Sequence, residues 1–167
     1  MSTSPRQRRA VGVGKGAKML TEIIKECLEK NKDDIASLKY VGQIEFFDIF
    51  PKSEKQKTEL ENEAENIAKI VDRSVRGNFY KFNKPLKTIF GELKFFKIRF
   101  FDKTKAVYDG APDFIVKDYR KFIDKYKNDK RFAFIKQETP PPYEGYKFQT
   151  EKTWACFINP PMSATFK

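Results

Sequence analysis

The stretch GELKFFKIRFF, residues 91–101, alternates large apolar side chains with cations directly after a glycine. Between Leu93 and Phe100 the alternation fails once, because Phe95 and Phe96 are adjacent and reverse the parity of the apolar positions. A β-bulge at this pair would restore it, since the extra residue of a bulge resets the register. We therefore expect a strand whose core face holds Leu93, Phe95, Phe96, Ile98 and Phe100, and whose exposed, basic face holds Lys94, Lys97 and Arg99.

The alternative is that these aromatic side chains form an exposed platform for stacking. Burial of each ring contributes about 2 kcal/mol, whereas several exposed rings would promote aggregation. The core interpretation is therefore favoured. The cations would then project outward beside Lys81, Lys87 and Lys105 on nearby strands, with Tyr80, Tyr108 and Tyr146 as occasional stacking partners for a nucleic acid.

Outward from this stretch, the periodicity of apolar residues predicts alternating helices and strands. A helix is expected at 19–37, a strand inside a sheet at 38–50, and a helix at 53–75 that begins at a Ser53 cap. An antiparallel meander follows at 78–108. Further along we expect a helix at 111–129, a strand at 131–137, and one or two strands at 146–158.

This order predicts an α+β protein, with about three helices packed on a mixed or antiparallel sheet of about five to six strands. The chain of 167 residues suits a single domain. We expect that domain at 19–158, after a flexible arm at 1–18 and before an irregular C-terminal tail at 159–167. The arm is rich in Ser, Pro and Gly and lacks large apolar residues that could dock.

The charge of +11 is unevenly distributed along the chain. The arm has five cations and no acid, residues 19–75 have 9 cations and 13 acids, and residues 76–167 have 20 cations and 10 acids. Such polarity favours a polyanionic partner, although a Lys-rich composition alone can serve solubility. The arm's candidate phosphate contacts are Arg6, Arg8, Arg9, Lys15 and Lys18.

The expected helix at 111–129 carries a second candidate surface. Lys117, Lys121 and Lys125 are spaced four residues apart, so on a helix they would form one basic stripe. The opposite side would hold the apolar residues Ile115, Tyr119, Phe122, Ile123 and Tyr126.

Composition argues against several kinds of site. The chain has no histidine, and its two cysteines, Cys27 and Cys156, are far apart, so we expect no zinc cluster, no histidine triad and no cofactor. No apolar run reaches the length of a membrane-spanning helix, and contact with an anionic membrane surface is weakly supported because the first helix mixes Glu with Lys on its polar face.

The function predicted from these patterns is non-catalytic, largely sequence-independent contact with nucleic acid, DNA or RNA, within a larger nucleoprotein assembly. One alternative is a structural subunit of a virus particle or another large complex, which uses the arm and the Pro-rich segments to contact neighbouring subunits. Another is a metal-dependent nuclease through Glu92 and Lys94, which form an E-x-K pattern on a strand. The expected location is the cytoplasm, the nucleus or a virion, with organelle import left open by the acid-free first 21 residues.

Overall fold

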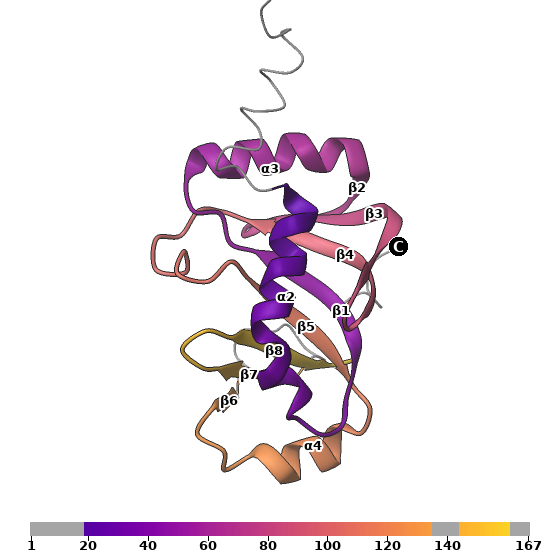
Figure 1. The fold of residues 1–167 in the computed structure, drawn as a ribbon, viewed down its shortest axis with the longest axis vertical. Helices are drawn as coiled ribbons and strands as arrows, with labels where there is room; N and C mark the ends of the chain where they lie inside the picture. Colours follow the sequence, from indigo (N-terminus) through magenta and orange to yellow (C-terminus); the bar gives the residue numbers. More distant parts are fainter. Residues whose placement is uncertain (1–18, 135–143, 161–167) are drawn as a thin grey trace, which may run out of the picture.

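A computed structural model describes residues 19–134 and 144–160 (Figure 1). This part of the chain contains three helices and one mixed sheet of eight strands, which confirms the α+β class. The sheet is larger than the five to six strands predicted. The helices are α2 (Leu20–Ala36), α3 (Glu54–Ile67) and α4 (Tyr119–Tyr126).

The strands follow the order β2-β3-β4-β1-β5-β8-β7-β6 across the sheet. The β1–β4 and β5–β8 pairs are parallel, and the other neighbouring pairs are antiparallel. In Figure 1 the sheet runs down the long axis of the molecule, with β2 near α3 at the top and β6 near α4 at the bottom. The strands are β1 (Val41–Ile49), β2 (Ala68–Ser74), β3 (Gly77–Thr88), β4 (Gly91–Arg99), β5 (Gly110–Val116), β6 (Phe132–Phe134), β7 (Glu144–Gln149) and β8 (Trp154–Asn159).

All three described helices bury their apolar sides against one face of the sheet, where a single cluster forms the core. The prediction for the first helix is confirmed: its apolar stripe of Leu20, Ile23, Ile24, Cys27 and Leu28 is buried. The cap of α3 is also confirmed, since Ser53 Oγ accepts a hydrogen bond from the Gln56 backbone N–H at 3.0 Å. The Gln56 side chain in turn accepts one from the Lys52 N–H at 2.6 Å.

Residues 91–99 form β4, but the apolar residues of the stretch at 91–101 do not all share one face. Leu93, Phe96 and Ile98 are in the core, whereas Phe95 pairs across from Lys81 on the opposite side and Phe100 is half exposed beyond the strand end. The prediction of one face was wrong because the register shift falls between the Lys81–Phe95 and Leu86–Leu93 pairs, just before Phe95, which leaves Phe95 on the opposite side. Pro85 falls inside this shift, and a proline cannot donate a ladder hydrogen bond.

The face of the sheet that points away from the helices is called the second face here. Residues opposite each other on neighbouring strands share a face, so the register defines it. Lys69 lies opposite Lys81, Phe79 opposite Lys97, and Lys97 opposite Asp48. Towards the other end of the sheet the second face continues through Phe46, Asp113, Cys156, Lys147 and Trp154.

Two segments predicted as helix are strands. The predicted helix at 53–75 ends at Ile67, and the remainder forms β2, which turns into β3 at Gly77, whose φ of 137° favours glycine. The start of the predicted helix at 111–129 is instead β5, and α4 covers only its middle. The prediction of helix for β5 was wrong because this strand lies in the middle of the sheet. A strand buried on both faces has no alternation of apolar and polar residues to distinguish it from a buried helix.

Candidate nucleic-acid interface

The predicted arm contacts lie outside the described residues. They are Arg6, Arg8, Arg9, Lys15 and Lys18, and the structure neither places them nor tests their role. Of the tail at 159–167, the structure describes Asn159, which ends β8, and Pro160. The candidate interface is therefore built from the sheet and from α4.

Lys97 is not on an exposed basic face, and this expectation was wrong. Its side chain is only 7% exposed, and its ammonium nitrogen lies 4.4 Å from the centre of the Phe79 ring. Burial lowers the pKa of Lys97, an effect that the charge of Asp48 opposes. A lysine in this position has little contact with solvent, so it is a poor candidate for binding phosphate directly.

Arg99 is also largely withdrawn from solvent. Its guanidinium donates to Asp48 Oδ2 at 3.2 Å, and it lies 5.8 Å from the centre of the Phe50 ring. The side chains of this ion pair are 15% and 18% exposed. The continuous basic band predicted for β4 is thus interrupted at Lys97 and Arg99, by burial in one case and by an internal acid in the other.

The exposed cations of the second face lie instead towards the β2 edge. Lys94 is exposed, as predicted, and so are Lys69, Lys81 and Lys87. Lys69 and Lys81 face each other across β2 and β3 and border a pocket of about 580 Å³, to which Val71 also contributes. Opposed like charges are destabilising, so this lysine pair is a feature that packing alone does not favour.

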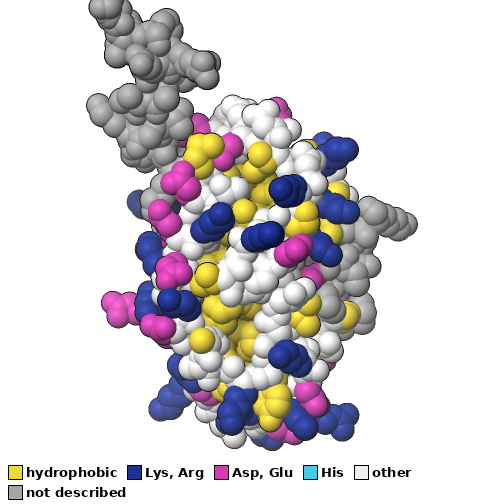
Figure 2. Space-filling model, turned by 45° about the vertical axis from the view of Figure 1, so that its right-hand side comes forward, with side chains coloured by type: hydrophobic (Ala, Val, Ile, Leu, Met, Phe, Trp, Pro, Cys, Tyr) yellow, Lys and Arg dark blue, Asp and Glu magenta, His cyan; other side chains and the backbone are white. Residues whose placement is uncertain are grey.

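Residues 68–94 as a whole carry seven cations and two acids, Asp72 and Glu92. All seven cations are exposed, and none forms an ion pair with another described residue. We call this region the β2–β4 surface. Figure 2 shows Lys and Arg side chains gathered in the upper half of the molecule and again at its lower end. The seven cations are Lys69, Arg73, Arg76, Lys81, Lys84, Lys87 and Lys94.

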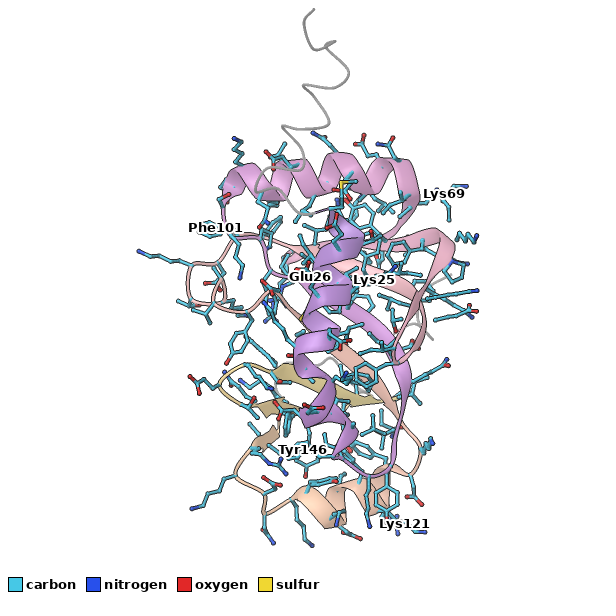
Figure 3. The ribbon with its side chains drawn as sticks, viewed as in Figure 1. Lys25, Glu26, Lys69, Phe101, Lys121 and Tyr146 are labelled. Carbon is cyan, nitrogen blue, oxygen red and sulfur yellow. The ribbon has the colours of Figure 1, made fainter. Side chains whose placement is uncertain are left out.

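A second basic surface lies around α4. The predicted stripe is only partly helical, because Lys117 precedes the helix and donates its backbone N–H to Tyr40 O at 2.8 Å, whereas Lys121 and Lys125 lie on α4. All three side chains are exposed. In Figure 3, Lys121 and Lys69 lie at opposite ends of the molecule, so the two surfaces are separate.

The middle of the second face holds buried acids that the sequence analysis did not identify. Asp113 is 7% exposed, and burial, reinforced by the charge of Asp48, raises its pKa well above the usual value. Asp48 Oδ1 is buried and has no hydrogen-bond partner. Together with Lys97 and Arg99 these acids form an internal ionic cluster, which explains why the basic band breaks here.

The nuclease alternative rested on Glu92 and Lys94. Both are exposed, and Glu92 lies opposite Lys87 in the β3–β4 pair. Within residues 19–134 and 144–160, no three or more Asp, Glu, Cys or His side chains are placed to hold a metal ion. The catalytic alternative is not tested by these observations and stays a prediction.

A cavity of about 560 Å³ lies between α2, the loop before β5 and the β7–β8 turn. Its polar groups bond to one another: Asp34 accepts from the Thr150 hydroxyl at 3.0 Å and from the Thr153 hydroxyl at 2.7 Å. Burial raises the pKa of Cys27, at its floor, to about 12, so this residue is a neutral thiol near pH 7. Among the described lining residues, Cys27 therefore offers no thiolate, and the Asp34 carboxylate is already engaged by two hydroxyl groups.

Comparison with known proteins adds information on the fold alone. No known protein family matches the sequence, and no curated protein is similar enough to match. A solved structure described as "Structural Genomics, Protein EC4020" is similar, with a TM-score of 0.57 over 91% of this chain and 86% of that one. Its sequence identity is 8%, so it supports the architecture and indicates no function. In the described part of the chain, no helix is long and apolar enough to cross a membrane.

Proposed function

We propose that the protein is a non-catalytic protein that binds nucleic acid through its phosphate backbone, largely independently of sequence. The β2–β4 surface is the main contact, and the α4 surface is a second one. The arm at 1–18, with five cations and no acid, adds charge of the same sign. The refined interface keeps Lys94 and replaces Lys97 and Arg99 with Lys69, Lys81 and Lys87.

The observation that carries this proposal is the pairing of Lys69 with Lys81. Their Cα atoms are register partners on adjacent strands, both side chains are exposed, and no described acid forms an ion pair with either. A directly opposed pair of like charges costs stability in the free protein. A phosphate between the two ammonium groups would remove this repulsion, so an anion fits the geometry better than solvent does.

Sequence independence follows from the side chains available. Five of the seven cations of the β2–β4 surface are lysines, which contact phosphate mainly as point charges. In the pocket that Lys69 and Lys81 border, Asn83 is the single described lining residue of the types that recognise a base by paired hydrogen bonds (Arg, Asn and Gln). The pocket therefore offers little for bidentate recognition of a base. Affinity should then depend on salt concentration and strand length rather than on base order.

The direct test is a binding titration of the full chain with fluorescently labelled oligonucleotides of equal length and unrelated sequence. We expect similar affinities for all sequences, and for each a steep loss of affinity as salt is raised. Inorganic phosphate serves as a control, because a single phosphate reaches at most one lysine pair, whereas a strand presents phosphates to the whole surface and should bind more tightly. Absence of binding at low salt, or binding that salt does not change, would contradict the proposal.

A role inside a larger assembly also stays a proposal, whether nucleoprotein complex or virus particle. Val75 is 87% and Val107 79% exposed, so these apolar side chains are where contact with a protein neighbour would gain most from burial. Sedimentation of native extracts separates the possibilities. Migration with nucleic acid that is lost after nuclease treatment indicates a nucleoprotein complex, whereas migration that resists nuclease indicates contacts between protein subunits.

A further inference from the structure

The second face carries a cluster of aromatic and cationic side chains around Trp154. The Trp154 side chain is half-buried, and its ring centre lies 5.2 Å from that of Phe50 and 5.5 Å from that of Tyr108. The ammonium groups of Lys147 and Lys105 lie over the indole at 5.1 Å and 5.5 Å from its centre. A partly exposed indole with lysines beside it is the combination that proteins use to bind unpaired bases and their phosphates.

We propose that Trp154 is a stacking platform for an unpaired nucleobase, and that the protein therefore prefers single-stranded nucleic acid to duplex. This inference rests on the proposed function and adds the class of nucleic acid. In a duplex both faces of each base are occupied by its neighbours, whereas a single strand leaves base faces free to stack on an aromatic side chain.

Two neighbouring rings hold the platform in place. Phe50 is 4% exposed, and its ring packs against the indole at an interplanar angle of 50°. The Tyr108 hydroxyl donates to Thr150 O at 3.2 Å and accepts from Gln149 Nε2 at 2.8 Å. Gln149 is also the register partner of Trp154 across β7 and β8. Binding therefore requires little reordering of the aromatic side chains.

The lysine over the indole suits an exchange with a base. Lys147 has a flexible side chain and a compact charge, and its attraction to the ring is about 0.5–2 kcal/mol. When a base stacks on the indole, the ammonium group can move from the ring to the phosphate of the same nucleotide. The ring contact is replaced by stacking, and the charge gains a stronger partner.

The platform and the Lys69–Lys81 pair of the β2–β4 surface lie on the same face of one sheet. From β3 to β8 there are four strand-to-strand steps, which is about 19 Å at about 4.8 Å a step. In B-DNA each strand advances about 3.4 Å along the helix axis per phosphate, and an unpaired strand can extend further, so about six nucleotides are enough to cover this distance. One short single strand is long enough to contact both Lys81 and Trp154.

The test uses the intrinsic fluorescence of the full chain, because Trp154 is the single tryptophan among its 167 residues. The probes are oligothymidylate of about twelve nucleotides, twice the estimated span, a duplex of the same length, and inorganic polyphosphate. We expect oligothymidylate to quench the emission and to bind more tightly than the duplex. Polyphosphate should bind without quenching, since it has charge but no bases.

The matched variant is Trp154→Leu. Because it lacks the tryptophan, its binding is measured with a fluorescently labelled oligonucleotide. Loss of one stacked base predicts about 5- to 140-fold weaker binding of the single strand, with polyphosphate affinity unchanged. Quenching in the wild-type protein needs no variant, so the inference remains testable if Trp154→Leu does not fold. Equal binding of single strand and duplex without quenching, or equal quenching by polyphosphate, overturns the platform but leaves the proposed function intact. If no probe binds at low salt, the proposed function itself is wrong.

Discussion

The ammonium nitrogen of Lys97 lies 4.4 Å from the centre of the Phe79 ring, in the middle of the second face of the sheet. Lysine and phenylalanine are register partners on β4 and β3, so the contact follows directly from strand pairing. It withdraws a charge from solvent where the sequence suggested an exposed cation. The exposed cations are consequently displaced towards the β2 edge, where Lys69 and Lys81 lie.

Replacing Lys97 by methionine should remove a pH dependence of stability. Burial lowers the pKa of Lys97 from 10.5, so between the two values the folded protein binds fewer protons than the unfolded chain. The free energy of unfolding of the wild-type protein therefore rises with pH across that window. In Lys97→Met this rise should be smaller, measured by urea unfolding between about pH 7 and pH 10.

The control for Lys97→Met is Lys94→Met, which changes an exposed lysine three positions away on β4. It should retain the wild-type pH dependence. If both variants behave alike, Lys97 is not the buried group that the structure places beside Phe79.

Replacing Asp113 by asparagine should stabilise the protein near neutral pH. Burial raises the pKa of Asp113 above 3.8, so the folded protein holds the proton more tightly than the unfolded chain. Stability falls as pH rises through that window, and the cost of the buried charge is fully present above the raised pKa. Asp113→Asn avoids this cost, so its free energy of unfolding should exceed that of the wild-type protein at about pH 7 and approach it near pH 4.

Urea unfolding of Asp113→Asn at several pH values makes this measurement, with the exposed Glu92→Gln as control. A loss of stability in Asp113→Asn at neutral pH would show that the charged carboxylate is favourable, through Lys97 or through the Cys156 thiol. The buried ionic cluster would then be a stabilising feature rather than a cost.

Replacing Phe122 by alanine should destabilise the protein by about 3–5 kcal/mol, because the cavity left behind adds to the lost burial. Phe122 is fully buried and packs against the rings of Tyr126, Phe132 and Phe157, which join α4 to the β6–β7–β8 end of the sheet. Phe100→Ala is the comparison, since that ring is 50% exposed. A similar loss of stability in both variants would contradict the packing at this end of the molecule.

Local patterns in the sequence predicted the elements that have one exposed face. The α2 stripe and the Ser53 cap were confirmed because periodicity and capping depend on near neighbours in the chain. The central strand β5 was missed because its apolar run and its proline resemble a helix start when its neighbours β1 and β8 are unknown. The conformation of β5 therefore depends on its pairing with β1 and β8 and not on its local sequence.

The candidate interface was predictable only where exposure follows from local pattern. Lys94 and Lys121 are exposed as expected, but burial of Lys97 depends on Phe79 and Asp48, which are 18 and 49 residues away in the sequence. Lys69 was missed because its segment was assigned to a helix. The only advance signal was the β-branched pair Ile70–Val71 followed by a glycine turn, which is typical of a hairpin.

The most direct measurement is the salt dependence of single-strand binding in two triple variants of equal net charge. One removes Lys69, Lys81 and Lys94 from the β2–β4 surface by substitution with glutamine. The other removes Lys25, Lys32 and Lys55 from α2 and α3 in the same way. Each phosphate contact contributes about 0.7 to the slope of log affinity against log salt concentration, so the account predicts a slope shallower by about 2 in the first variant. The second variant should keep the wild-type slope. A slope that becomes equally shallow in both variants, or that changes in neither variant, would contradict binding through the β2–β4 surface.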